Sequence, residues 1–148
     1  MSRTADVRLL ETGFDAARAL AQFAASHPAS GGIASFIGQV RGEAEALELT
    51  HYAPLTLAGM EAIANAALDR WELSGLLVWH RVGRLAPGEQ IVLVAAAARH
   101  RRAAFEAVDF TMDHLKSAAW FWKRELSDGQ WAWIEPRPED RADLARWS

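Results

Sequence analysis

The spacing of apolar positions divides the chain into amphipathic helices and short strands. Apolar side chains recur at helical intervals in residues 15–25 and 57–71, which predicts two helices. A third helix is expected to follow Arg102. Its apolar stripe would consist of Phe105, Val108, Met112 and Leu115. Pro136 and Pro138 are expected to begin a short fourth helix that ends near residue 147.

Apolar or alternating runs that end at Gly, Pro or polar residues predict strands. They cover residues 7–10, 33–40, 47–52, 76–82, 90–97 and 130–134. A short polar connection joins the second and third runs, so we expect those two strands to pair. The run 90–97 is apolar almost throughout, as in a strand covered on both faces. The order of elements favours an α+β domain over a doubly wound parallel sheet, and we expect residues 1–148 to form a single domain.

Composition narrows the classes of function. The net charge of -3 argues against an extended nucleic-acid surface, which needs a clustered excess of Lys and Arg. The chain has no cysteine, so any sulfur used in its chemistry must come from elsewhere. No segment is typical of a signal peptide or long enough to span a bilayer, so we expect a cytoplasmic protein.

Two lysines are the first candidates for chemistry. Lys116 and Lys123 are seven residues apart, about two helical turns, and the aromatic run 120–122 lies between them. In a continuous helix both ammonium groups would emerge from one face beside an apolar surface. Burial there would lower a lysine pKa and make the amine useful as a base or nucleophile. The alternative is a pair of solvated lysines on an amphipathic helix.

A basic run, Arg99-His100-Arg101-Arg102, lies where a buried strand is expected to become a helix. Guanidinium groups beside the free N–H groups of a helix N-terminus form an anion site, which suits phosphate. Solvated cations at a strand end would give the same pattern. Arg41, at the end of the strand 33–40, is a second possible anion ligand.

The five histidines lack the spacing of a metal site, and no nucleotide-binding fingerprint or nucleophile elbow is present. We therefore expect no metal. His51 and His80 are expected to be core or interface residues that find hydrogen bonds.

Four groups of residues occur in an ordered arrangement. They are Phe36-x-Gly38-x-Val40-Arg41; Trp79-His80-Arg81-Val82-Gly83 with Pro87-Gly88-Glu89; His100-Arg101 with Ala104-Phe105-Glu106-Ala107; and Lys116 with Phe121-Trp122-Lys123-Arg124-Glu125. Over about residues 31–147 they resemble the large, catalytic subunit of molybdopterin synthase. The resemblance implies an α/β hammerhead-type domain with an antiparallel or mixed sheet and flanking helices. It also implies a homodimer that binds a small ubiquitin-like sulfur carrier at each end, giving a heterotetramer.

The reaction implied by the resemblance is a sulfur transfer in molybdenum cofactor biosynthesis, with no bound cofactor. The thiocarboxylate at the Gly-Gly tail of the carrier donates sulfur to cyclic pyranopterin monophosphate, which forms the dithiolene of molybdopterin. By the same resemblance, Lys116 and Lys123 are the catalytic lysines, with Lys116 preferred as the acid/base or nucleophilic group. The substrate-binding residues are Gln39, Val40, Arg41, His100, Arg101, Arg124 and Glu125.

The sequence departs from the family pattern at Gln39, where lysine is frequent, in residues 50–55, and in the short loop 42–46. Two other hypotheses remain open from the residues alone. One is a non-catalytic module that binds a phosphorylated ligand or a partner protein through the basic run. The other is a Schiff-base lyase that uses Lys116. A lysine of lowered pKa beside the anion site would favour catalysis over simple binding.

Overall fold

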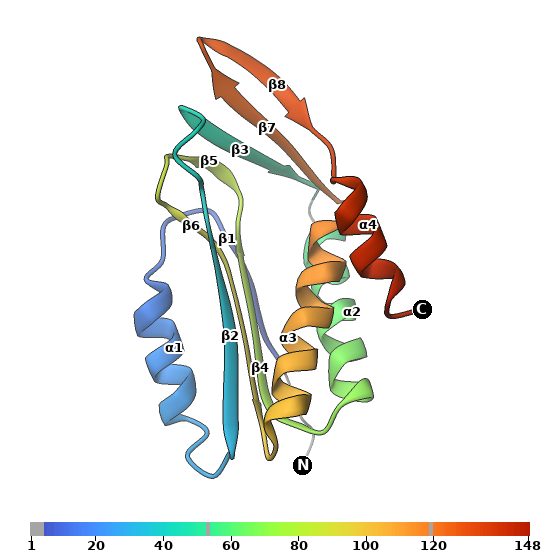
Figure 1. Ribbon diagram of the computed structural model, residues 1–148. Helices are drawn as coiled ribbons and strands as arrows, with labels where there is room; N and C mark the ends of the chain where they lie inside the picture. Colours follow the sequence, from blue (N-terminus) through green and yellow to red (C-terminus); the bar gives the residue numbers. More distant parts are fainter. Residues whose placement is uncertain (1–4, 53, 119) are drawn as a thin grey trace.

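The computed structural model describes residues 5–52, 54–118 and 120–148. In chain order the elements are β1 (Asp6–Leu10), α1 (Ala16–Ala25), β2 (Gly32–Gln39), β3 (Ala46–His51), α2 (Leu55–Arg70), β4 (Leu73–Arg81), β5 (Gly83–Leu85), β6 (Gln90–Ala98), α3 (Arg101–Lys116), β7 (Phe121–Ser127), β8 (Gln130–Ile134) and α4 (Pro138–Ala145). The mixed helix and strand content predicted from the sequence is confirmed (Figure 1). No helix in these described ranges is long and apolar enough to cross a membrane.

The larger sheet has the strand order β1-β4-β6-β2, and we call it sheet A. β1 pairs with β4 in parallel, whereas β4–β6 and β6–β2 are antiparallel. Helix α1 covers one face of sheet A, and α2 and α3 cover the other (Figure 1). β2 is the last strand in this order, so it is an edge strand.

The central strand β6 confirms the expectation of a strand covered on both faces. Val92, Val94 and Ala96 belong to the core under α2 and α3, whereas Leu93 and Ala95 belong to the core under α1. Successive side chains of a strand point to opposite faces, so an unbroken apolar run suits a sheet that lies between helices.

The second sheet, sheet B, has the strand order β5-β3-β7-β8 and lies across the upper end of sheet A in Figure 1. β3 pairs antiparallel with β5 and with β7. The predicted pairing of β2 with β3 is therefore wrong. The backbone of Val40, just after β2, exchanges hydrogen bonds with Gly88 and Glu89, which ties the end of β2 to the turn before β6. The loop 42–46 then carries the chain from sheet A into sheet B. β2 and β3 therefore do not form a hairpin, although the loop between them is short.

The continuous helix expected through Lys116 and Lys123 is also wrong. Helix α3 ends at Lys116, and Phe121 begins a strand that pairs with six residues of β3. Aromatic residues fit a pleated surface well, and the cross-strand pairs of β7 override the helical spacing. The predicted stripe of α3 is wrong at Phe105, which is 54% exposed, whereas Val108 and Leu115 are buried as expected.

Candidate active site

A pocket of about 480 Å³ lies where the end of β2, the C-terminal end of α3, the strand β7 and the start of α4 meet. This volume is within the range of roughly 300–1,000 Å³ that is typical of small-molecule sites. We call it the lysine pocket. Its wall includes Phe36, Gln39, Val40, Arg41, His80, Met112, Lys116, Phe121, Lys123, Glu125, Ile134, Pro136, Arg137 and Asp140.

Both predicted catalytic lysines line this pocket, although they come from different elements. Lys116 is the last residue of α3, and Lys123 lies on β7. They are the only two lysines in the chain. Neither lysine forms an ion pair with any residue that the structure describes. The pocket therefore presents two ammonium groups that are available to an anionic ligand.

The surroundings of Lys123 change its protonation. The pKa of Lys123 is lowered from 10.5 to about 8, chiefly by burial and also by the positive charge of Lys116, while the carboxylate of Asp140 acts in the opposite direction. Loss of hydration disfavours the charged form of an amine, and a nearby like charge does the same. A significant fraction of Lys123 is therefore a neutral amine just above neutral pH, which can accept a proton or attack a carbonyl carbon.

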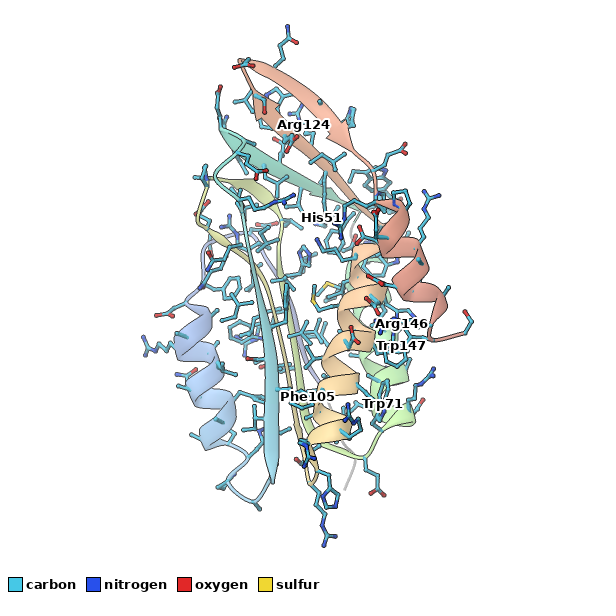
Figure 2. The ribbon with its side chains drawn as sticks, viewed as in Figure 1. His51, Trp71, Phe105, Arg124, Arg146 and Trp147 are labelled. Carbon is cyan, nitrogen blue, oxygen red and sulfur yellow. The ribbon has the colours of Figure 1, made fainter. Side chains whose placement is uncertain are left out.

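The alternation of β7 decides which of its residues face the pocket. Phe121, Lys123 and Glu125 line it, as expected for residues two apart on one face of a strand. Arg124 lies on the opposite face of sheet B (Figure 2), where its Nε donates a 2.8 Å hydrogen bond to Glu48. Its guanidinium also lies 4.3 Å from the ring centroid of Trp131. Of the two wall residues predicted from β7, the structure therefore brings Glu125 to the pocket and leaves Arg124 outside it.

Three of the substrate-site candidates are the last residue of β2 and the two residues that follow it. Gln39, Val40 and Arg41 all line the pocket. The Val40 N–H donates a 2.9 Å hydrogen bond to the Glu89 carbonyl oxygen, which fixes this part of the wall. The Arg41 side chain is 83% exposed, and its nearest carboxylate, that of Glu43, is 3.9 Å away. Arg41 is thus free to turn toward a ligand.

His100 and Arg101 lie at the opposite end of α3 from Lys116. Fifteen helical steps separate Arg101 from Lys116, which corresponds to about 22 Å. Both His100 and Arg101 are exposed, and neither lines the lysine pocket. Gly31 packs so closely here that a Cβ would clash with the carbonyl oxygen of Arg99. A single chain therefore does not bring the basic run and the lysines together.

Several pocket residues were not predicted as site residues, and three of them with polar side chains are His80, Arg137 and Asp140. His80 was expected only as a core or interface residue, and Arg137 and Asp140 of the α4 region were not singled out at all. Asp140 accepts hydrogen bonds from the backbone N–H of Arg137, at 3.1 Å, and from its guanidinium, at 3.2 Å. The sequence also contains a signal for the lysines themselves, because the two pocket lysines are the only lysines in the chain.

Within the ranges that the structure describes, no group of three or more His, Cys, Asp or Glu residues is arranged to hold a metal ion. The polar side chains that line the pocket include two amines, two guanidinium groups, an imidazole and carboxylates.

Comparisons with known proteins identify the family of this chain. The family model described as MoaE protein matches residues 9–118. The molybdopterin synthase catalytic subunit of Ralstonia nicotianae is 45% identical over 147 residues, which cover 95% of this chain and 83% of that protein. The structure of the molybdopterin biosynthesis MoaE protein from Burkholderia ambifaria has a TM-score of 0.83 at 42% identity, over 97% of this chain and 98% of that chain. The same fold, with a TM-score of 0.75 at 21% identity, occurs in a complex of subunits 1 and 2 of the molybdopterin-converting factor from Helicobacter pylori, over 88% of this chain and 91% of that chain. The resemblance carried by the four groups of residues is thus confirmed, and the chain belongs to the MoaE family of molybdopterin synthase catalytic subunits.

Proposed function

We propose that the lysine pocket is the site where sulfur passes from a thiocarboxylated carrier protein to cyclic pyranopterin monophosphate. The observation that carries this proposal is the convergence of the chain's only two lysines, from α3 and β7, on one pocket of substrate size. A thiocarboxylate and a phosphate are both anions, and two ammonium groups without ion-pair partners suit both. The chain has no cysteine, so the sulfur must come from a donor.

The lowered pKa of Lys123 favours an enzyme over a module that only binds phosphate. A binding site gains from lysines that stay fully charged, whereas burial of an amine weakens the charge and stabilises the neutral form. We assign Lys116 and Lys123 to acid/base or nucleophilic catalysis. Gln39, Val40, Arg41 and Glu125 form the wall around the substrate.

The carrier is proposed to reach the pocket across the edge of sheet B. β8 is an edge strand, with Trp133 65% exposed and Ile134 38% exposed, and Ile134 also lines the pocket. An exposed apolar edge suits a partner protein, and an extended Gly-Gly tail can enter beside it without side-chain clashes. Deleting the two terminal glycines of the carrier should abolish turnover even if the two proteins still associate.

A homodimer would explain how the basic run contributes although one chain keeps it far from the lysines. β2 is an edge strand, and Ile33 and Phe36 on it are exposed, as is Phe105 on the neighbouring helix α3 (Figure 2). Antiparallel pairing of β2 with β2 of a second copy would bury these side chains. It would also turn the second copy around, so that its Arg101 end lies beside the Gln39 end of the first.

The lengths of the two elements fit this arrangement. β2 spans about 27 Å, and the separation of Arg101 from Lys116 along α3 is about 22 Å. We therefore propose that His100 and Arg101 of one copy bind the phosphate of the substrate held in the lysine pocket of the other. With one carrier on each copy the assembly is a heterotetramer. We also propose that residues 1–148 form a single domain and that the protein is cytoplasmic.

Reconstitution tests the function directly. The purified chain is incubated with cyclic pyranopterin monophosphate and a thiocarboxylated carrier, and the dithiolene product is measured. The expected result is product that depends on the thiocarboxylate and is absent with an unmodified carrier. Substrate binding without any dithiolene would favour the binding-module alternative. Borohydride trapping of the substrate on a lysine, without a carrier, would favour the Schiff-base lyase.

A further inference from the structure

His80 is a buried histidine in the wall of the lysine pocket, and the roles assigned above do not use it. It is 5% exposed and lies near the end of β4. Leu76 and Val78 precede it on the same face of sheet A, toward α3, and both belong to the core. His80 continues this apolar row into the pocket, where its neighbours in the wall include both lysines.

One hydrogen bond fixes the tautomer of the imidazole ring. The Nδ1 atom lies 2.7 Å from the carbonyl oxygen of Arg81. A carbonyl oxygen only accepts hydrogen bonds, so Nδ1 carries the proton and donates it. The neutral ring then leaves Nε2 with a lone pair. No residue that the structure describes donates a hydrogen bond to Nε2.

The ring is also held in orientation and kept neutral. It stacks on Phe121 of β7, with the ring centroids 4.2 Å apart and an angle of 22° between the planes. The pKa of His80 is lowered to about 3, chiefly by burial. The positive charges of Lys123 and Lys116 also lower this pKa, whereas the hydrogen bond to the Arg81 carbonyl raises it. His80 is therefore a hydrogen-bond acceptor at every pH at which the enzyme would work.

A fixed acceptor in the same pocket as two cations adds a kind of recognition that the cations do not provide. Ammonium and guanidinium groups only donate, so they select the anionic parts of a ligand. A ligand that supplies a donor gains a hydrogen bond from this acceptor, whereas a ligand without a donor does not. A ligand that carries only phosphate has no ring donor to offer, whereas a pterin ring has N–H groups.

We infer that His80 is a specificity-determining residue whose Nε2 accepts a hydrogen bond from an N–H or O–H group on the ring system of the substrate, beside the lysine pair. This inference rests on the proposed function, because it takes the substrate to be a pterin phosphate. It assigns phosphate recognition and ring recognition to different groups. The ammonium and guanidinium groups bind the phosphate, and His80 distinguishes a pterin from other phosphorylated molecules.

Two substitutions separate this role from a purely structural one. His80→Asn retains an N–H that can donate to the Arg81 carbonyl, but it removes the acceptor on the pocket side. His80→Gln has a longer side chain, which can present its carbonyl oxygen near the position of Nε2. Thermal unfolding of both variants shows whether they fold, and calorimetry without the carrier gives the affinity for two probes, cyclic pyranopterin monophosphate and inorganic phosphate.

We expect His80→Asn to bind the pterin monophosphate roughly fivefold to thirtyfold more weakly than the unsubstituted protein, the effect of one hydrogen bond. Its affinity for inorganic phosphate should not change, and His80→Gln should recover part of the loss. Equal pterin affinity in the unsubstituted protein and His80→Asn would overturn the inference. A parallel loss for inorganic phosphate would also overturn it, because that result indicates a distorted pocket.

A third measurement needs no substitution. In protein with ¹⁵N-labelled histidine, the His80 Nε2 resonance should be that of an unprotonated nitrogen, and it should shift when the pterin monophosphate is added but not when inorganic phosphate is added. An Nε2 that is protonated in the free protein would contradict the inference. If the unsubstituted protein does not bind the pterin monophosphate at all, the proposed function fails together with this inference, whereas normal binding with an unmoved Nε2 resonance rejects the inference alone.

Discussion

The two ends of helix α3 carry the same kind of charge in opposite settings. At the C-terminal end, Lys116 lies in a pocket whose other lysine, Lys123, has its pKa lowered to about 8 by burial. At the N-terminal end, His100 and Arg101 are exposed to solvent. Enclosure changes the protonation of an amine and so permits chemistry, whereas exposure preserves charge and suits binding. The difference suggests that one end of the helix performs catalysis and the other holds an anion.

The largest effect is expected from Lys116→Ala, at the pocket end of α3. Loss of a positioned acid/base or nucleophilic group should lower the rate of dithiolene formation by about two orders of magnitude or more. Urea unfolding should hardly change, because Lys116 is exposed at the end of its helix and contributes little to the core. Lys116→Arg is the matched control, since it keeps the positive charge but does not release its proton. Near-normal turnover in Lys116→Ala would remove the catalytic role.

Lys123→Met should lower activity less than Lys116→Ala, and it should make the protein more stable. The folded state holds Lys123 with a pKa of about 8, against 10.5 for the unperturbed side chain, so below pH 8 the buried charge costs about 3 kcal/mol of stability. Between pH 8 and 10.5 the unfolded chain binds more protons than the folded one, so this cost disappears as pH rises. Urea unfolding of both proteins at pH 7 and pH 10 measures it. A stability difference that is the same at both pH values would show that Lys123 is not buried as a charge.

At the exposed end, Arg101→Ala should weaken substrate binding by about 1.5–3 kcal/mol, which is typical of a charge-assisted hydrogen bond. Its folding should be unimpaired, because a cation in the first turn opposes the helix dipole and stabilises little. Arg18→Ala, at an exposed position on α1, is the control. Unchanged substrate affinity in Arg101→Ala, measured by calorimetry, would mean that Arg101 is simply a solvated residue.

The smallest effect on substrate binding is expected from Arg124→Ala. The family resemblance assigns Arg124 to the substrate wall, but its side chain contacts Glu48 and Trp131 on the outer face of sheet B. Loss of these half-exposed contacts should lower the free energy of unfolding by about 1 kcal/mol and leave substrate affinity unchanged. The reverse result, a stable protein with weakened substrate binding, would support the assignment made from the resemblance.

The sequence was sufficient for those features that depend on local patterns. The unbroken apolar run of β6 predicted a strand covered on both faces, and the ordered motifs included the two lysines that the fold brings to one pocket. The strand β7 was missed because Lys116 and Lys123 have helical spacing, and only pairing with β3, far away in the sequence, makes residues 121–127 a strand.

The strand conformation of β7 also bears on the site wall that the family resemblance assigned. A strand turns each successive side chain to the other face, so Arg124 and Glu125 cannot both face the pocket. Arg137 and Asp140 enter the site only because α4 folds back against α3, an arrangement that no local pattern encodes.

Mixed dimers test most directly whether the two ends of α3 from different copies form one site. Lys116→Ala and Arg101→Ala proteins are combined, allowed to exchange subunits, and assayed for dithiolene formation at low substrate concentration. In a mixed dimer, the intact lysine pocket of the Arg101→Ala copy would meet the intact Arg101 of the Lys116→Ala copy, so we expect activity well above that of either protein alone. Activity that equals the average of the two separate proteins, with exchange verified by mass spectrometry, would show that the two ends of α3 do not form one site across the dimer.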